Sequence, residues 1–428
     1  MPRYIIGYSF ELLNHLMEFA LARRGLQICT KYTKAIKMAD VPEVLRNGYV
    51  GATSLADEKL EQLATDLGSV DAPRYMIERI EGLLCERRSN FADASQKLLN
   101  VFTETQYLPI LNEFFWPFSR IISQVPEQTF WSVINLFLDV IDSLYKNNKD
   151  PEEKARFNTF FAFFVYHAPG SIEVKKSIAR KWLELVGVES IRTELMGFLS
   201  GPDAVLPVST VRFFAYILAC VGLEDEVIGV NTIVAENSKQ EDFLTKLTAF
   251  SAEGYAASGI FRNSTDFFCD LLLDFNDFGN VLDIGCGPGR IGENIRDQCQ
   301  SLTGIELKPE YADFARTQSR YDEVIEGDAV TEIAKLSSTY DFITSCMALD
   351  YFPAQAVIHD AAKLLNPGGC LAFSFIPAEK DAENVLAHAY HYERDFYKKA
   401  APDLSVVKCV MEPYMWTGGY YVLLKRDH

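Results

Sequence analysis

A run of nine residues in the C-terminal half constrains the fold of this chain more than any other feature. Residues 281–289 read Val-Leu-Asp-Ile-Gly-Cys-Gly-Pro-Gly. The apolar start is typical of a buried strand, and the three glycines at alternate positions leave the backbone of a turn bare. From Arg290 onward the pattern indicates a helix. A strand, a bare loop and a helix in this order form a cradle of the size that a nucleotide needs.

The glycine spacing separates two classes of nucleotide cofactor. Dinucleotide-binding loops follow G-x-G-x-x-G and hold a pyrophosphate, whereas this loop reads G-x-G-x-G and has Asp283 two residues before Gly285. A carboxylate aimed at the loop repels a pyrophosphate and suits a ligand that carries an ammonium group. The spacing therefore disfavours two alternatives, NAD bound on the same topology and a plain glycine turn without a ligand.

On these residues the C-terminal part resembles the class I methyltransferases that use S-adenosylmethionine (SAM). SAM carries an ammonium, a carboxylate and a sulfonium group and no phosphate. The first motif of that family looks like Asp283-Ile-Gly-Cys-Gly-Pro-Gly289. The resemblance covers roughly residues 250–428, and within the superfamily it is greatest to predicted methyltransferases often associated with tetratricopeptide repeats. It implies SAM as the cofactor and methyl transfer as the reaction.

A periodic pattern of strands and helices follows the loop. We expect strands over 281–284, 301–306, 323–326, 341–346 and 370–376, with helices between them, and such units form a parallel sheet. After a helix near 387–399, two strands at 404–410 and 420–425 are joined by a turn at 417–419, too short for a crossover helix. With the resemblance, this predicts an α/β domain with a Rossmann-like, mostly parallel seven-stranded sheet and an antiparallel last strand.

The predicted cofactor residues gather at the carboxyl ends of these strands, where such sheets bind ligands. Glu306 lies 21 residues after Gly285, at the place expected of a carboxylate that binds both hydroxyls of a ribose. The resemblance implies that Asp328 accepts a hydrogen bond from the adenine amino group, and Tyr255 and Arg262 are candidates for the cofactor's carboxylate. The cofactor-binding prediction comprises Asp283, Gly285, Cys286, Gly287, Pro288, Gly289, Glu306, Leu307, Asp328, Ala329, Cys346, Met347, Tyr255 and Arg262.

Methyl transfer from a sulfonium needs alignment and exclusion of water, but neither a metal nor a covalent intermediate. A hydroxyl acceptor usually needs a base. The candidates are Asp350 and Tyr351 after the fourth strand, His388 and His391 before the last hairpin, and His359. Each has an ordinary alternative, since Asp350 suits a helix cap and the histidines suit a surface. His388 and His391 come nearest to metal-ligand spacing, but no cysteine is near them, and no metal site is predicted.

The first 240 residues predict an all-helical domain, either a bundle or a degenerate helical-repeat array without a fixed period. Aromatic stripes such as Phe157–Phe164 favour a packed core over a ligand groove. The expected domains are 1–240, for substrate recognition, partner binding or dimerisation, and 241–428, for methyl transfer. Capping signals open helices at Ser54–Asp57, Asp150-Pro151 and Ser238–Glu241, and amphipathic runs cover 72–87, 127–146, 172–186 and 208–223.

Composition narrows the partners and the compartment. The chain has 59 acidic and 41 basic residues, a net charge of −18, of which residues 241–428 carry −13. This charge repels phosphate backbones, so no nucleic-acid partner is expected. No segment has the length of a membrane span, and no signal peptide is recognised. The nine scattered cysteines lack a C-x-x-C pair, which favours a reducing, cytoplasmic setting.

Two functions follow from the sequence. The first is a SAM-dependent methyltransferase that modifies an O or N atom of a small molecule or of a glycan sugar, with a homodimer as one arrangement. The alternative is a recruitment protein: its helical domain binds a protein partner, which the SAM-binding domain methylates or merely accompanies.

Overall fold

The computed structural model describes residues 42–105, 125–147, 150–200, 208–237, 259–318, 320–384, 389–415 and 417–427, with Ala252 and several positions between 110 and 122. By its contacts the chain falls into two compact units, which divide between Val133 and Ile134. The helices between 134 and 237 therefore pack in the same unit as the sheet. The domain boundary predicted at residue 240 falls outside the described residues and stays a prediction.

The N-terminal unit is helical, as the sequence predicts. Its described helices are α2 (Glu43–Val50), η1 (Ala52–Ser54), α3 (Asp57–Ser69), α4 (Arg74–Arg87) and α5 (Phe91–Thr105). Leu60, Leu63 and Leu67 recur at helical spacing and bury one face of α3. The predicted capping role of Ser54 is wrong. Its hydroxyl donates to Gly51 O over 2.8 Å, so it closes the preceding 3₁₀ turn, and α3 begins after Ala56 without a side-chain cap.

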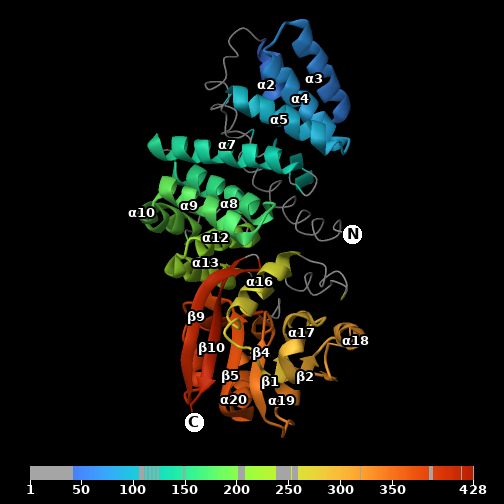
Figure 1. The fold of residues 1–428 in the computed structure, drawn as a ribbon. Coiled ribbons are helices and arrows are strands. Elements are labelled where there is room, and N and C mark those ends of the chain that lie inside the picture. Colours follow the sequence, from blue (N-terminus) through green and yellow to red (C-terminus); the bar gives the residue numbers. More distant parts are fainter. Residues whose placement is uncertain are drawn as a thin grey trace. The chain divides into compact units, whose positions relative to one another are not determined.

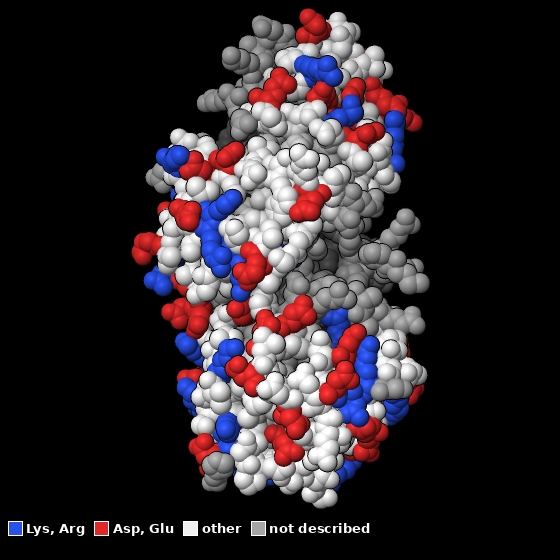
Figure 2. All heavy atoms as spheres, viewed as in Figure 1, with Lys and Arg blue, Asp and Glu red and all other residues white. Residues whose placement is uncertain are grey.

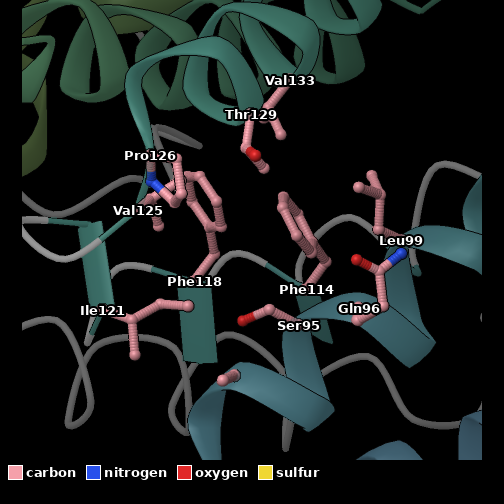
Figure 3. A pocket seen from close by; sticks show the side chains of 11 residues that line it. Ser95, Gln96, Leu99, Phe114, Phe118, Ile121, Val125, Pro126, Thr129 and Val133 are labelled. Carbon is pink, nitrogen blue, oxygen red and sulfur yellow. The ribbon is translucent and has the colours of Figure 1, made fainter.

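A cavity of about 250 Å³ lies inside the N-terminal unit (Figure 3). Phe114 and Phe118 lie beside it with their ring centroids 4.9 Å apart. The lining is mostly apolar and holds none of the predicted site residues. It consists of Ala92, Ser95, Gln96, Leu99, Phe114, Phe118, Ile121, Val125, Pro126, Thr129 and Val133.

The second unit contains a helical layer that follows the predicted runs closely. Its helices are α7 (Glu127–Lys146, which begins in the first unit), α8 (Pro151–His167), α9 (Ile172–Val186), α10 (Val188–Ser190), η3 (Ile191–Met196), α11 (Gly197–Ser200), α12 (Val208–Cys220) and α13 (Glu224–Asn237). Asp150 caps α8 as predicted, because its side chain accepts from Glu152 N over 2.8 Å. The aromatic residues of α8 are buried, with Phe163 edge to face against Phe213 of α12 and Phe164 against Phe137 of α7. They form a packed core.

The sheet confirms the predicted fold class. Strands β1 (Gly279–Ile284), β2 (Cys299–Glu306), β3 (Glu323–Glu326), β4 (Tyr340–Ser345), β5 (Leu365–Phe375), β9 (Leu404–Tyr414) and β10 (Thr417–Arg426) form a seven-stranded sheet in the order β3-β2-β1-β4-β5-β10-β9. The first five strands pair in parallel, and β10 runs antiparallel to both β5 and β9 (Figure 1). The remaining helices here are α16 (Gly259–Asp270), α17 (Arg290–Ile295), η5 (Arg296–Gln298), α18 (Pro309–Thr317), α19 (Ala329–Ile333), η6 (Leu349–Tyr351) and α20 (Ala354–Leu364).

Two local predictions near the C-terminus are wrong. Residues 417–419 belong to β10, and the turn comes earlier, where Met415 has a φ of 47°. The helix expected near 387–399 is instead strand β8 (Ala389–Glu393) followed by the short helix α21 (Phe396–Ala400). Strand β8 lies between β6 (Pro377–Ala378) and β7 (Ala382–Asn384) in a small sheet. Backbone hydrogen bonds to two neighbours outweigh the local helical pattern.

Helices α12 and α13 pack on the edge of the main sheet where β4 and β5 end. Because β10 is antiparallel, its first residues lie at this carboxyl edge. Asn231 of α13 donates to Gly418 O over 3.1 Å and accepts from Thr417 Oγ1 over 2.6 Å. Thr232 accepts from Glu379 N over 2.9 Å. The helical layer is therefore joined by hydrogen bonds to the segments that border the predicted site.

On the face that Figure 2 shows, acidic and basic side chains of the described residues occur in small groups over helices and sheet. This face has no large area of a single charge sign. Within the described parts of the chain, no helix combines the length and the apolar character needed to cross a bilayer.

Candidate functional site

The three glycines of the loop after β1 leave its backbone uncovered by side chains, as the sequence predicts. Gly285, Gly287 and Gly289 have φ angles of 70°, 54° and 92°, which favour glycine strongly. A Cβ on Gly285 would lie 2.4 Å from the Cβ of Ala348, so the loop after β4 packs directly on this turn. A Cβ on Gly287 would meet nothing within 4 Å. Open space therefore lies beside the middle of the loop.

Glu306 at the end of β2 reaches this loop. Its Oε2 accepts from Gly287 N over 2.9 Å, and its Oε1 accepts from Lys308 N over 2.8 Å. Burial raises the pKa of Glu306, and the backbone N–H donors oppose the rise. The next residue, Leu307, is 64% exposed, which places an apolar side chain in solvent beside the carboxylate.

Asp283 is 1% exposed and both of its oxygens have protein partners. Tyr321 Oη donates to Oδ2 over 2.7 Å, and Thr344 Oγ1 donates to Oδ1 over 2.9 Å. Tyr321 Oη also accepts from Gly292 N over 3.2 Å, so the network joins α17 to β1. Burial raises the pKa of Asp283 to about 6, and the two hydroxyl donors oppose the rise. Asp283 is therefore a buried carboxylate, held by Tyr321 and Thr344 directly before the glycine loop.

Sequence reasoning did not assign roles to Tyr321 and Thr344. Tyr321 lies in a loop 38 residues after Asp283, and Thr344 lies in a strand 61 residues after it. A hydroxyl that binds a carboxylate so far away in the chain produces no recognisable spacing in the sequence.

Asp328 follows β3 and is exposed at the same edge. Its Oδ1 accepts from Thr331 N over 3.0 Å, so it caps the short helix α19, of which the buried Ala329 is the first residue. Only Oδ1 takes part in the cap, and the side chain remains exposed to solvent.

Cys346 and Met347 are buried where β4 ends. Met347 has a φ of 55°, an uncommon conformation for a residue with a side chain. Its N–H donates to Ser374 Oγ of β5 over 2.9 Å. Backbone strain of this kind persists when neighbouring contacts impose it, and strained residues cluster at functional sites.

Asp350 in η6 does not cap the following helix. Its Oδ1 accepts from Ile376 N over 2.9 Å, and its Oδ2 accepts from Tyr414 Oη over 2.5 Å. The side chain is 2% exposed, and burial raises its pKa to about 7, against the opposing effect of these two donors. Tyr351 lies beside it, and burial raises the pKa of that phenol above its ordinary value.

His391 on β8 belongs to the same region. Tyr392 N donates to Ile376 O over 3.1 Å, and the Tyr392 hydroxyl donates to Phe352 O over 2.5 Å and accepts from Ala354 N over 2.9 Å. These bonds fasten β8 beside η6. His391 is 3% exposed, and its Nδ1 has no hydrogen-bond partner among the described residues.

The environment keeps His391 neutral. Burial lowers its pKa to about 3, and the positive charge of Arg212 on α12 adds to this effect. The sequence assigned no role to Arg212, which is buried on α12 in the helical layer.

Three predicted residues are not placed. Tyr255 and His388 lie outside the described residues, and Arg262 lies on α16, but its side chain is likewise outside what the structure describes. His359 lies on α20, and its Nδ1 is 3.2 Å from Ala400 O, away from the loop. Within the described ranges, no three His, Cys, Asp or Glu side chains are grouped closely enough to hold a metal.

Comparison with known proteins adds independent findings. A family model described as "Methyltransferase domain" matches residues 281–369. The malonyl-[acyl-carrier protein] O-methyltransferase of Enterobacter lignolyticus (strain SCF1) is 32% identical over 103 residues, which cover 24% of this chain and 41% of that protein. The ubiquinone biosynthesis O-methyltransferase of Klebsiella pneumoniae (strain 342) is 33% identical over 154 residues, 35% of this chain and 62% of that protein.

The chain spans about half the length of the curated relatives it matches. Among solved structures, the N-methyltransferase NodS of Bradyrhizobium japonicum WM9 in complex with S-adenosylhomocysteine is similar with a TM-score of 0.33 and 18% identity, over 46% of this chain and 99% of that one.

Proposed function

We propose that this chain, whose C-terminal part is a class I SAM-dependent methyltransferase domain, transfers a methyl group to an oxygen atom of a small molecule. The matched family and the strand order agree on the domain class that the sequence predicts. The closer resemblance to proteins associated with tetratricopeptide repeats stays a prediction. Both curated relatives described above are O-methyltransferases, which favours oxygen over nitrogen as the acceptor atom.

One observation supports the proposal above all others: the bond between Gly287 N and Glu306 Oε2, 2.9 Å long, inside the segment that matches the family. It brings the bare loop and the acid together beside the open space at Gly287. A nucleoside fits such a place, because two adjacent ribose hydroxyls match the two oxygens of one carboxylate. The residues present therefore fit SAM.

The other residues predicted for the cofactor suit its remaining parts. The exposed side chain of Leu307 and the chain at Asp328 and Ala329 would receive the adenine, and the segment Cys346–Met347 would border the reacting end. Asp283 would favour the ammonium group through the loop that it supports. When bound, SAM supplies a methyl group on a positively charged sulfur, so the acceptor needs only a lone pair and alignment.

The chain must also remove a proton from a hydroxyl acceptor. Of the predicted bases, we propose His391, because its ring is neutral and its Nδ1 has no partner among the described residues. Asp350 uses both oxygens to bind Tyr414 and Ile376 N, so we propose that it positions the edge of the site, with Tyr351 beside it. His388 stays a candidate.

Calorimetry with S-adenosylhomocysteine tests the cofactor site. We expect micromolar binding to the wild-type chain and its loss in Glu306→Ala. Glu323→Ala, which removes an exposed acid from the neighbouring strand, serves as the matched control and should bind like wild type. Absence of binding to the wild-type chain contradicts the proposal, and protection by NADH instead would favour the dinucleotide alternative.

The protein is then incubated with fractionated extract and with SAM that carries a labelled methyl group. The molecule that receives the label identifies the acceptor class. Label in a small molecule supports the proposed function. Label found only in a captured protein supports the alternative of recruitment through the helices.

A further inference from the structure

The chain is strained directly after β4. Met347 has a φ of 55° and is 6% exposed, so a buried residue with a large side chain lies in the left-handed region. A residue other than glycine rarely adopts this conformation, and it persists only when neighbouring contacts hold it there. The contact that fixes Met347 therefore also fixes the direction in which the chain leaves β4.

This contact comes from the neighbouring strand β5. Ser374 Oγ accepts a hydrogen bond from Met347 N over 2.9 Å, and the serine is 0% exposed. Burial raises the pKa of the Cys346 thiol well above its ordinary value, and a hydrogen bond with the same Ser374 hydroxyl opposes the rise. One buried hydroxyl thus holds two consecutive residues that are predicted to border the cofactor.

The direction of the chain after β4 matters because this segment packs on the glycine loop. A Cβ on Gly285 would lie 2.4 Å from the Cβ of Ala348, the residue directly after Met347. Ser345 Oγ donates to Ile284 O over 3.0 Å, so the residue directly before the loop is also bonded to the end of β4. A movement at Met347 would therefore be transmitted to Gly285.

Ser374 and Glu306 lie on strands that are well separated in the sheet. The order β2-β1-β4-β5 places three strand spacings between them, which is about 14 Å at the usual distance between neighbouring strands. Glu306 bonds to Gly287 N, at the place proposed for the ribose. Ser374 therefore acts on a different part of a bound cofactor from the part that Glu306 would hold.

We infer that Ser374 is a positioning residue for the cofactor: its hydroxyl holds Met347 in the left-handed conformation, and this places the segment Cys346–Ala348 beside the amino-acid end of SAM. The inference rests on the proposed function, which puts Cys346 and Met347 at the reacting end of the cofactor. Without the hydroxyl, Met347 N–H would be buried without an acceptor, and the chain would turn toward an ordinary φ. Ala348 would then move away from Gly285, and the amino-acid end of the cofactor would be held less tightly.

Calorimetry with two ligands that differ at this end tests the inference. S-adenosylhomocysteine has a nucleoside and an amino-acid end, whereas adenosine has the nucleoside alone. Ser374→Ala should weaken the binding of S-adenosylhomocysteine about 10-fold, the equivalent of one hydrogen bond, and should change the binding of adenosine by less than about twofold. Glu306→Ala, in contrast, should weaken the binding of both ligands.

Ser264→Ala is the matched control. Ser264 Oγ accepts from Met415 N over 2.7 Å, Met415 has a φ of 47°, and both residues are buried. The two serines therefore do the same thing locally, but Ser264 lies on α16 and holds the turn between β9 and β10. Its loss should lower the thermal unfolding midpoint much as Ser374→Ala does, and should leave the ratio of the two affinities at its wild-type value.

Ser374→Cys provides a second measurement, which keeps the comparison available if the alanine variant does not fold. A thiol is a weak acceptor, so the affinity of this variant for S-adenosylhomocysteine should lie between those of wild type and Ser374→Ala.

Three results would overturn the inference. The Ser374 variants keep the wild-type ratio of affinities or weaken both ligands equally, Ser264→Ala changes the ratio as much as Ser374→Ala, or adenosine does not bind a wild-type chain that binds S-adenosylhomocysteine. Failure of S-adenosylhomocysteine to bind the wild-type chain would instead overturn the proposed function.

Discussion

Tyr414 donates a hydrogen bond of 2.5 Å from its hydroxyl to Oδ2 of Asp350, which joins the end of β9 to η6. The other oxygen of the same carboxyl group accepts from Ile376 N, just after β5. One buried side chain thus holds together three segments from distant parts of the sequence, at the edge where the proposed acceptor binds. This arrangement has measurable consequences for stability and activity.

Asp350→Asn should change the dependence of stability on pH. The pKa of Asp350 is about 7 in the folded chain, above its ordinary value near 3.8, so the folded state favours the protonated form. Its contribution to stability is fully present below about pH 4 and is lost as the pH rises through 7. The variant should therefore gain stability relative to wild type between pH 5 and pH 8, by no more than roughly 4 kcal/mol.

Urea unfolding at these two pH values measures the difference. Asp403→Asn, which changes an exposed aspartate, should show no such trend. A constant difference between Asp350→Asn and wild type across this pH interval would contradict the prediction.

Tyr321→Phe should destabilise the chain and weaken the binding of S-adenosylhomocysteine. The variant removes the donor to Asp283 Oδ2 and the acceptor of Gly292 N, and leaves both buried groups without that partner. The expected loss is about 1–3 kcal/mol. Thermal unfolding and calorimetry measure both effects, and Tyr340→Phe at the start of β4 is the matched control. Unchanged stability would show that the network does not support the loop.

His391→Gln should lower kcat of methyl transfer by about 10²- to 10⁴-fold, the contribution typical of a general base.

The pKa of His391 is about 3, below its ordinary value of 6.5, so the imidazole ring stays neutral near pH 7. The stability that this histidine contributes is present above pH 6.5 and is lost as the pH falls toward 3. Single-turnover kinetics measure the rate, and the affinity for S-adenosylhomocysteine should not change. An unaltered kcat would exclude His391 as the base.

Gly418→Ala should destabilise the junction between the helical layer and β10. A Cβ at this position would lie 2.7 Å from Cγ1 of Val227 and 2.8 Å from the Cβ of Ala219. The overlap should cost about 1–3 kcal/mol, measured by chemical denaturation. Gly197→Ala places a Cβ in α11 where nothing lies within 4 Å, and it should be neutral or slightly stabilising. Equal effects of the two substitutions would mean that α12 and α13 do not pack tightly on β10.

Much of the fold could be predicted because its signals are local. The apolar runs before Gly285, Glu306 and Asp328 predict strands β1, β2 and β3, and β3 (Glu323–Glu326) has the predicted bounds. Helices α7 and α9 also begin and end where the hydrophobic period indicates. The prediction of a helix near 387–399 is wrong because β8 pairs with β6 and β7, which lie outside the segment whose pattern suggested the helix.

The sequence by itself determined the strand order along the chain, the glycine loop and the acid Glu306 at the end of the next strand, because each depends on a local pattern of residues. Only the tertiary structure decided that Tyr321 and Thr344 donate hydrogen bonds to Asp283 and that Tyr414 donates one to Asp350. Those relationships join segments far apart in sequence. They arise from burial, which forces each polar group to find whichever partner the packed fold places beside it.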